Sequence, residues 1–133
     1  MQHPDHVEPY VLVADDDPLT LKSVSIVLRG AGMRVVTVSD GAAALAQLRR
    51  EKPRVVVFDV MMGSMSGLDL CRLVKSDSSL RDVYVILLTA RAMQRERQEG
   101  LAAGADDYVS KPFSNRDLLA RVQRALAASP PRP

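Results

Sequence analysis

Five side chains that suit phosphoryl chemistry stand at or near the ends of apolar runs in this sequence. They are Asp15 and Asp16 after residues 11–14, Asp59 after residues 55–58, Thr89 after residues 83–88, and Lys111 shortly after residues 106–109. A carboxylate at the carboxyl end of a buried strand lies where open α/β sheets bind their ligands. Three acids, a hydroxyl and an amine at one sheet edge are the parts of a metal-assisted phosphoryl site.

The three carboxylates set the chemistry that this sheet edge could support. Close together they repel one another, and each resists ionisation unless a cation compensates. Mg²⁺ (or Mn²⁺) takes oxygen ligands, and Mg²⁺ keeps several waters, which leaves positions open for a phosphate. Asp59 could then attack a phosphoryl donor and hold an acyl phosphate, while Lys111 and Thr89 contact the phosphoryl oxygens.

Taken singly, each of these residues has a simpler explanation. The Asp15–Asp17 run precedes Pro18 and suits a helix N-terminus, and Asp59 alone could also cap a helix. Lys111 alone is a surface lysine, and Thr89 alone is a strand end. The coincidence of four strand ends in one register favours a shared site over these separate explanations.

The elements that must position these side chains follow from the apolar pattern. Short apolar runs alternate with segments of helical period, which predicts βαβ units and a parallel sheet. The predicted strands are residues 10–14, 34–38, 55–59, 83–88 and 106–109, with helices expected after Asp17, Asp40, Ser66 and Ser114. The fold class is therefore α/β, a single (βα)5 doubly wound parallel sheet.

The segment from Arg91 to Leu101 differs from the other predicted helices. Its charged residues leave only Met93 and Leu101 at helical spacing. We expect a helix with so narrow an apolar stripe to be loosely packed.

Length and composition limit the class of protein. A chain of 133 residues and 14.5 kDa suits one compact domain, and a formal net charge of +2 predicts no nucleic-acid binding by it. Cys71 is the only cysteine, which excludes an intrachain disulfide and favours the reducing cytoplasm. The polar first ten residues predict no secretory signal, and no apolar run suits a membrane span.

Four motifs resemble those of the receiver domain of two-component response regulators. They are Val11–Asp17 (VLVADDD), Val57–Met62 (VFDVMM), Leu88–Arg91 (LTAR) and Gly104–Phe113 (GADDYVSKPF). The resemblance implies a flavodoxin-like sheet with strand order 2-1-3-4-5. It also implies a receiver domain over residues 10–128, a flexible N-terminal tail at 1–9, and a Pro-rich tail or linker at 129–133.

The resemblance implies a role for each candidate residue. Asp59 is the expected phosphoacceptor, charged by the phosphohistidine of a histidine kinase or of a histidine phosphotransfer protein. The expected Mg²⁺ ligands are Asp15, Asp16, Asp59 and the Met61 backbone carbonyl, and the expected phosphate-binding residues are Lys111, Thr89 and Ala90. Such a domain is not an enzyme, because it assists only its own phosphorylation and dephosphorylation.

The same resemblance implies a switch. Phosphorylation is expected to draw the Thr89 hydroxyl inward, and the Tyr108 ring follows into the space released. The signal then appears on the face formed by the segment after Thr89, the last strand and the last helix. The Lys111–Pro112 peptide bond is expected to be cis.

One loop departs from the family pattern. Relatives commonly carry proline directly after the second methionine and an acid or amide before the glycine, where this chain has Gly63 and Ser66. Glycine adds backbone freedom that proline would remove. No ligand is lost, so the departure bears on loop rigidity, phosphoryl lifetime and kinase fit.

Three other functions are consistent with parts of the pattern. A small Mg²⁺-dependent aspartyl phosphatase uses similar residues, but it wants a second acid at position 61, which is Met. An FMN carrier shares the fold class, but its phosphate loop would fall on the acids at 15–17. A receiver-like binding module that works without phosphorylation is the third, and only the altered loop favours it.

The sequence allows two alternatives for how the domain passes on its signal. The initial methionine favours a stand-alone receiver, and the Pro-rich end permits a receiver cut from a longer regulator. Charged residues of the last predicted elements resemble the dimer face of receivers attached to winged-helix DNA-binding domains, which implies homodimerisation on phosphorylation: Arg97, Asp106, Asp107, Asp117 and Arg121. A solvated charged face explains these residues equally well.

Overall fold

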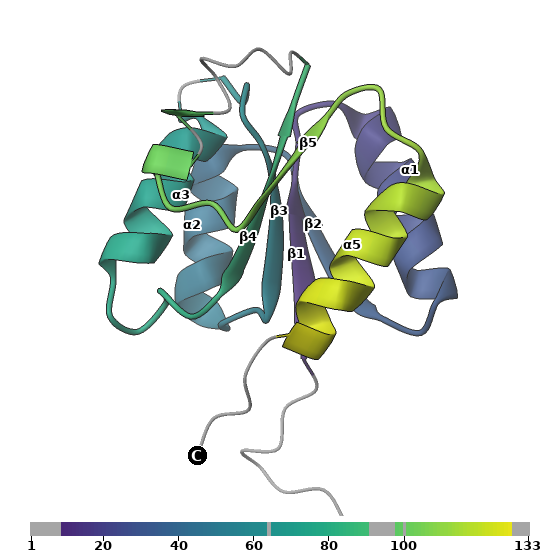
Figure 1. Ribbon diagram of the computed structural model, residues 1–133, viewed down its shortest axis with the longest axis horizontal. Coiled ribbons are helices and arrows are strands. Elements are labelled where there is room, and N and C mark those ends of the chain that lie inside the picture. The colour runs from purple at the N-terminus through teal and green to yellow at the C-terminus, as the bar shows by residue number, and fades with distance from the viewer. Residues whose placement is uncertain (1–8, 64, 91–97, 100, 129–133) are drawn as a thin grey trace, which may run out of the picture.

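A computed structural model describes residues 9–63, 65–90, 98, 99 and 101–128. Five parallel strands form one sheet in the order β2-β1-β3-β4-β5 (Figure 1). The strands are β1 (Tyr10–Ala14), β2 (Arg34–Val38), β3 (Val55–Asp59), β4 (Tyr84–Thr89) and β5 (Asp107–Ser110). The predicted fold class and strand order are confirmed.

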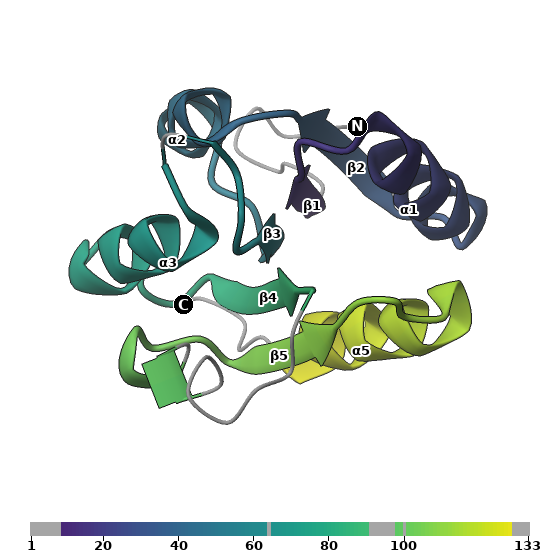
Figure 2. The same ribbon diagram turned by 90° about the horizontal axis from the view of Figure 1, so that it is seen from above.

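Helices cover both faces of the sheet. The described helices are α1 (Pro18–Gly30), α2 (Gly41–Arg50), α3 (Gly67–Ser76) and α5 (Asn115–Ala128). Figure 2 shows α1 and α5 on one face and α2 and α3 on the other. None of these helices has the length and apolar character needed to cross a membrane.

Polar side chains begin the helices where the sequence predicted. The Asp17 carboxylate accepts a hydrogen bond from Leu19 N at 3.1 Å, and Pro18 follows at the first helical position, where it costs no hydrogen bond. Corresponding caps are made by Asp40 to Ala43 N (2.7 Å), Ser66 to Asp69 N (3.1 Å) and Ser114 to Asp117 N (2.9 Å). Each cap satisfies a backbone N–H that lacks a partner within its helix.

The core has two layers because successive strand residues point to opposite faces. Leu12, Phe58 and Leu87 pack toward α2 and α3, whereas Val13 and Ile86 pack toward α1 and α5. All residues of the central strands β1 and β3 are buried. Their continuous apolar runs are therefore what a sheet covered on both faces requires.

The fourth and fifth predicted strands were each displaced by one residue, since the structure has them at Tyr84–Thr89 and Asp107–Ser110. The fourth strand begins at Tyr84 because the Val83 N–H closes a turn with the Leu80 carbonyl (2.9 Å). The fifth begins at Asp107, because the Asp106 carboxylate takes the Val85 N–H (2.8 Å) that a backbone ladder would use. The predicted loosely packed helix falls largely on residues 91–97 and 100, outside the described residues.

Candidate functional site

Strand register brings the candidate residues to one edge of the sheet. Ala14 of β1 pairs with Phe58 of β3, so Asp15 and Asp59 follow at the same level. On the other side Asp59 pairs with Leu88, which places Thr89 one residue further along β4. The crossovers of a parallel sheet therefore gather residues that are distant in sequence.

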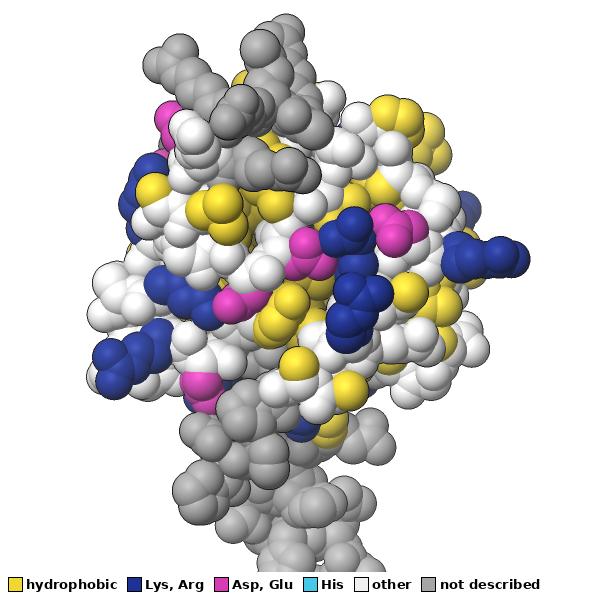
Figure 3. All heavy atoms as spheres, viewed as in Figure 1, with side chains coloured by type: hydrophobic (Ala, Val, Ile, Leu, Met, Phe, Trp, Pro, Cys, Tyr) yellow, Lys and Arg dark blue, Asp and Glu magenta, His cyan; other side chains and the backbone are white. Residues whose placement is uncertain are grey.

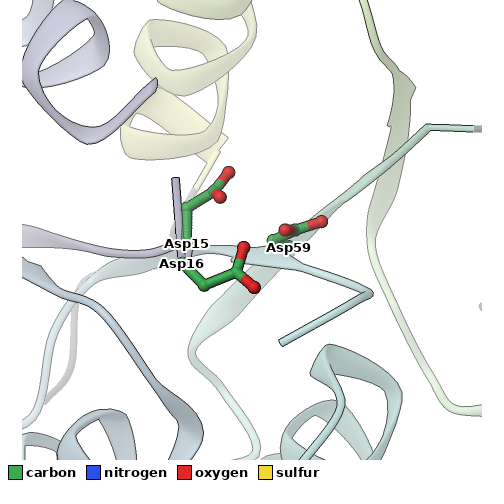
Figure 4. Close-up of side chains that lie close together, drawn as sticks. All are labelled: Asp15, Asp16 and Asp59. Atoms are coloured by element: carbon green, nitrogen blue, oxygen red, sulfur yellow. The ribbon is translucent and has the colours of Figure 1, made fainter. Parts of the chain in front are cut away.

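The three acids form one cluster. Asp15 and Asp16 follow the end of β1, and Asp59 is the last residue of β3 (Figure 4). One carboxylate oxygen from each lies within 4.8 Å of those of the other two. Asp15 and Asp59 are buried, whereas Asp16 is exposed, so the cluster opens to solvent on the Asp16 side.

Lys111 neutralises part of this charge. Its Nζ lies 2.8 Å from Asp15 Oδ2 and 3.5 Å from Asp59 Oδ2. Burial acts to lower the Lys111 pKa, but the hydrogen bond to Asp15 and the charge of Asp59 outweigh it and raise the pKa above its usual value. A backbone bond from Lys111 N to Thr89 O and the cis Lys111–Pro112 peptide, which was expected, complete this corner.

Asp59 is poorly stabilised as a carboxylate. Burial raises its pKa to about 6, and the charge of Asp15 acts in the same direction. Lys111 and the Met61 N–H, which donates to Asp59 Oδ1 at 3.3 Å, act against this rise. The protein thus holds an acid at the strand end with too little positive charge to balance it.

The donor set fits a hard divalent cation. The clustered ligand atoms are carboxylate oxygens, which Mg²⁺ prefers, and the described cluster contains no thiolate or imidazole. Lys111 brings one positive charge to two buried acids, Asp15 and Asp59, and to their exposed neighbour Asp16. A divalent ion would supply the charge that this cluster lacks.

Comparisons with known proteins decide the family. Residues 11–123 match the family model of the response regulator receiver domain. The chain belongs to this family. Its site is accordingly that of a receiver domain, which accepts a phosphoryl group in two-component signalling, and the predicted family is confirmed.

Individual relatives agree with this assignment. The chain is 42% identical over 126 residues to the probable transcriptional regulatory protein TcrX of Mycobacterium tuberculosis, covering 95% of this chain and 53% of TcrX. It is 40% identical over 122 residues to the DNA-binding response regulator MtrA of Mycolicibacterium smegmatis, covering 92% of this chain and 52% of MtrA. The receiver domain therefore spans about half the length of these curated relatives.

A solved receiver domain gives the same fold. The receiver of the sensor histidine kinase PA1611 from Pseudomonas aeruginosa superposes with a TM-score of 0.83 at 30% identity, covering 92% of this chain and all of that one. That crystal structure has a magnesium ion coordinated in its active-site cleft.

The expected switch and phosphate-binding residues of the receiver lie on β4 and β5 and just after β4. Thr89 is buried at the end of β4, and Tyr108 of β5 is half-buried against the core beneath α2 and α3. Ala90 follows Thr89 and lines a groove of about 570 Å³ that also reaches Lys111. Thr89 and Ala90 therefore lie at the edge of the sheet that carries the site, whereas Tyr108 pairs with Leu87, two residues before Thr89. The roles of all three stay predictions.

Sequence reasoning missed the apolar wall of that groove. Leu19 of α1 and Phe113 line it, and Leu19 is 75% exposed. The signal was present in the sequence, because Leu19 falls outside the buried stripe of Val24 and Leu28 on α1. Leu19 therefore places an apolar side chain on the solvent side of α1, beside the site.

The structure brings together only part of the predicted dimer face. Arg121 of α5 donates to both carboxylate oxygens of Asp107 (2.8 and 3.0 Å) and to Asp117 Oδ2 (3.0 Å). Asp106 instead pairs with Lys75 of α3 at 2.8 Å, and Arg97 lies outside the described residues. Figure 3 shows acidic and basic side chains interspersed over β5 and α5.

Proposed function

We propose that this receiver domain accepts a phosphoryl group on Asp59 from a phosphohistidine. A carboxylate oxygen of Asp59 attacks phosphorus as the bond to the imidazole nitrogen breaks, and the histidine leaves with its electron pair. The single observation that carries the proposal is the buried Asp59, held between Asp15 and Lys111 at the end of β3 with a raised pKa. A carboxylate so poorly balanced is reactive and favours acquiring a cation.

Asp15, Asp16, Asp59 and the Met61 carbonyl are the proposed ligands of Mg²⁺. When bound, the ion neutralises the acids and the incoming phosphoryl oxygens. The magnesium ion of the PA1611 receiver supports this assignment. Asp15 also keeps Lys111 in place, because its Oδ1 accepts the Asp17 N–H (2.9 Å) while its Oδ2 accepts from Nζ.

Lys111, Thr89 and Ala90 are the proposed contacts for the phosphoryl group. The Lys111 ammonium lies near enough to Asp59 to bind an oxygen of the transferred group. The buried Thr89 hydroxyl would move toward that group, and Tyr108 would follow. This movement is the proposed signal on β5 and α5.

The proposed partner is a histidine kinase or a histidine phosphotransfer protein. The groove beside Lys111, with Leu19 and Phe113 on its wall, gives a protein donor an apolar surface next to Asp59. We further propose a cytoplasmic domain over residues 10–128 that is not an enzyme in its own right. Homodimerisation on phosphorylation would use Asp107, Asp117 and Arg121, whose mutual pairing favours a preformed face.

Labelling with acetyl phosphate and Mg²⁺ tests the proposal. We expect one phosphoryl group per chain, measured by intact-protein mass spectrometry, and none on Asp59→Asn because the amide cannot form an acyl phosphate. Asp17→Asn is the matched control, since asparagine caps α1 as well as aspartate does and the site keeps its acids. Labelling of Asp59→Asn at the wild-type level would place the acceptor elsewhere.

A further inference from the structure

An apolar groove lies between α1 and the segment that joins β5 to α5. Its volume is about 570 Å³, and its apolar lining comes from Leu19 and Val24 of α1 and from Pro112 and Phe113 of the joining segment. Lys111 lines the same groove. A ligand in the groove would therefore contact apolar side chains and a cationic one together.

The polar side chains along the groove already have partners within the protein. Asn115 Nδ2 donates to Ser23 Oγ at 2.9 Å, which joins the first turn of α5 to α1. The Thr20 hydroxyl donates to Asp17 Oδ2 at 2.7 Å. Because these contacts satisfy part of their hydrogen-bonding capacity, an occupant of this part of the groove does not need polar groups of its own.

Lys111 connects the groove to the phosphoacceptor. Its Nζ lies 3.5 Å from Asp59 Oδ2, and Ala90, which follows the end of β4, lines the groove as well. A phosphoryl group that approaches Asp59 can contact this ammonium, which is a strong partner for phosphate oxygens. Whatever that phosphoryl group is attached to would then lie within reach of the groove. The matching ligand has an anionic phosphate at one end and an apolar group at the other.

We propose that the groove binds the apolar chain of a small acyl phosphate, which phosphorylates Asp59 directly. A carboxylate oxygen of Asp59 forms a bond to phosphorus as the bond between phosphorus and the acyl oxygen breaks, and the donor leaves as a carboxylate with that electron pair. Donor and product are both mixed anhydrides of a carboxylic acid and phosphoric acid, so the transfer requires no other source of energy. The inference rests on the proposed function and adds a second class of phosphoryl donor.

The length of the acyl chain isolates the contribution of the groove. Acetyl, propionyl and butyryl phosphate carry similar carboxylate leaving groups and differ mainly in apolar chain. Burying one methylene group favours binding about fourfold. Because the groove is open to solvent and Leu19 on its wall is 75% exposed, the longer chain is buried only in part. At equal concentrations below saturation, we expect butyryl phosphate to phosphorylate the protein about fourfold faster than acetyl phosphate.

Leu19 and Ile26 provide a matched pair of variants. Both are exposed apolar residues of α1, but Ile26 lies outside the lining of the groove that contains Lys111. From position 19 to position 26 the helix rises by about 10 Å. Serine at either position leaves the buried residues Val24 and Leu28 of α1 in place, so both variants should fold.

The experiment measures initial rates of phosphorylation by intact-protein mass spectrometry, with Mg²⁺ and each of the three acyl phosphates. The phosphorylated protein is the same with every donor, so its own hydrolysis cancels from the comparison. We expect the rate to rise with chain length in wild type and in Ile26→Ser, and to be nearly independent of chain length in Leu19→Ser. None of the donors should label Asp59→Asn, because the amide cannot form an acyl phosphate.

Three outcomes overturn the inference while leaving the proposed function intact. The first is a wild type that all three acyl phosphates label at equal rates. The second is a Leu19→Ser variant that keeps the wild-type dependence on chain length. The third is an Ile26→Ser variant that loses this dependence as completely as Leu19→Ser, since the effect would then not come from the groove. A wild type that no donor labels would instead count against the proposed function, and the inference would fall with it.

Discussion

The carboxyl and amino edges of the sheet differ in how completely their charged side chains are paired. At the carboxyl edge, Lys111 faces the buried acids Asp15 and Asp59, with Asp16 beside them. At the amino edge the acids are matched: Arg34 makes two hydrogen bonds to Glu51 (2.6 and 2.8 Å). The paired charges of the amino edge stabilise the fold. At the carboxyl edge the acids outnumber the cation, which leaves negative charge that a cationic ligand can neutralise.

Asp106 and Lys75 show how completely the amino edge is satisfied. Lys75 Nζ reaches Asp106 Oδ2 (2.8 Å) and the carbonyls of Arg81 (3.1 Å) and Val83 (2.8 Å). The same Asp106 oxygen accepts the Val85 N–H. One ion pair thus joins α3 to the beginnings of β4 and β5.

Arg34 and Tyr10 make a second matched group at this edge. The Arg34 guanidinium lies 4.9 Å from the centre of the Tyr10 ring, and the Tyr10 hydroxyl donates to the Glu51 carbonyl. Gln47 donates to the same hydroxyl at 3.2 Å. Charged and polar side chains therefore stabilise the fold here, because each has a partner.

Removing a cation from the matched edge should produce the largest loss of stability. We expect Lys75→Met to lower the free energy of unfolding by about 2–3 kcal/mol, since it removes the cation from Asp106 and the donor from two carbonyls while keeping an apolar stem. The Lys75 side chain is 20% exposed, so water replaces only part of these bonds. Urea denaturation measures the change.

Lys52→Met is the matched control for that experiment. Lys52 pairs with Asp82 at 2.6 Å, but its side chain is 42% exposed, and such surface pairs contribute about 0–1 kcal/mol. Mg²⁺ affinity should stay at the wild-type value in both variants. If Lys75→Met lowered the free energy of unfolding no more than Lys52→Met does, the charge pairs of the amino edge would not be a special source of stability, and the two edges would not differ in this respect.

The pH dependence of the free energy of unfolding should reveal the unbalanced negative charge around Asp59 at the carboxyl edge. With a raised pKa, metal-free native Asp59 binds more protons than the unfolded chain between its ordinary value of 3.8 and about 6. Stability therefore falls as pH rises through this window and levels off above it. Relative to Asp59→Asn, which does not titrate, we expect wild type to lose about 2 kcal/mol between pH 4 and pH 7.

Urea denaturation of both proteins in EDTA across this range measures the difference. Saturating Mg²⁺ should abolish it, because the ion favours the ionised carboxylate. Parallel pH profiles for wild type and Asp59→Asn in EDTA would show that Asp59 is as well balanced as the acids of the amino edge.

The sequence predicted the carboxyl edge better than the amino edge. Short apolar runs ending in Asp15, Asp59 and Thr89 allowed both the sheet and its reactive edge to be inferred, because parallel strands end together. The Lys75–Asp106 pair joins residues 31 positions apart through a helix end and a loop. No periodicity encodes such a contact, so sequence reasoning did not foresee that Asp106 pairs with Lys75.

The conformation of Gly63 was also beyond sequence reasoning. The sequence shows a glycine, but it does not show whether space or backbone angle requires it. At Gly67 the requirement is space, and at Gly63 it is a φ of +59°. Only three-dimensional contacts separate the two.

Mg²⁺ should reduce the difference between the two edges, because it supplies the positive charge that the acids of the carboxyl edge lack. At about ten times its Kd, the ion should stabilise wild type by about 1.4 kcal/mol, because it binds the folded state alone. We expect a smaller rise in melting temperature for Asp16→Ala, which removes the exposed carboxylate of the cluster. Asp69→Ala, which removes an exposed acid of α3 near Arg72, should respond to Mg²⁺ as wild type does. Equal shifts in all three proteins would mean that the ion binds away from Asp16, and the surplus of negative charge at the carboxyl edge would then need a different ligand.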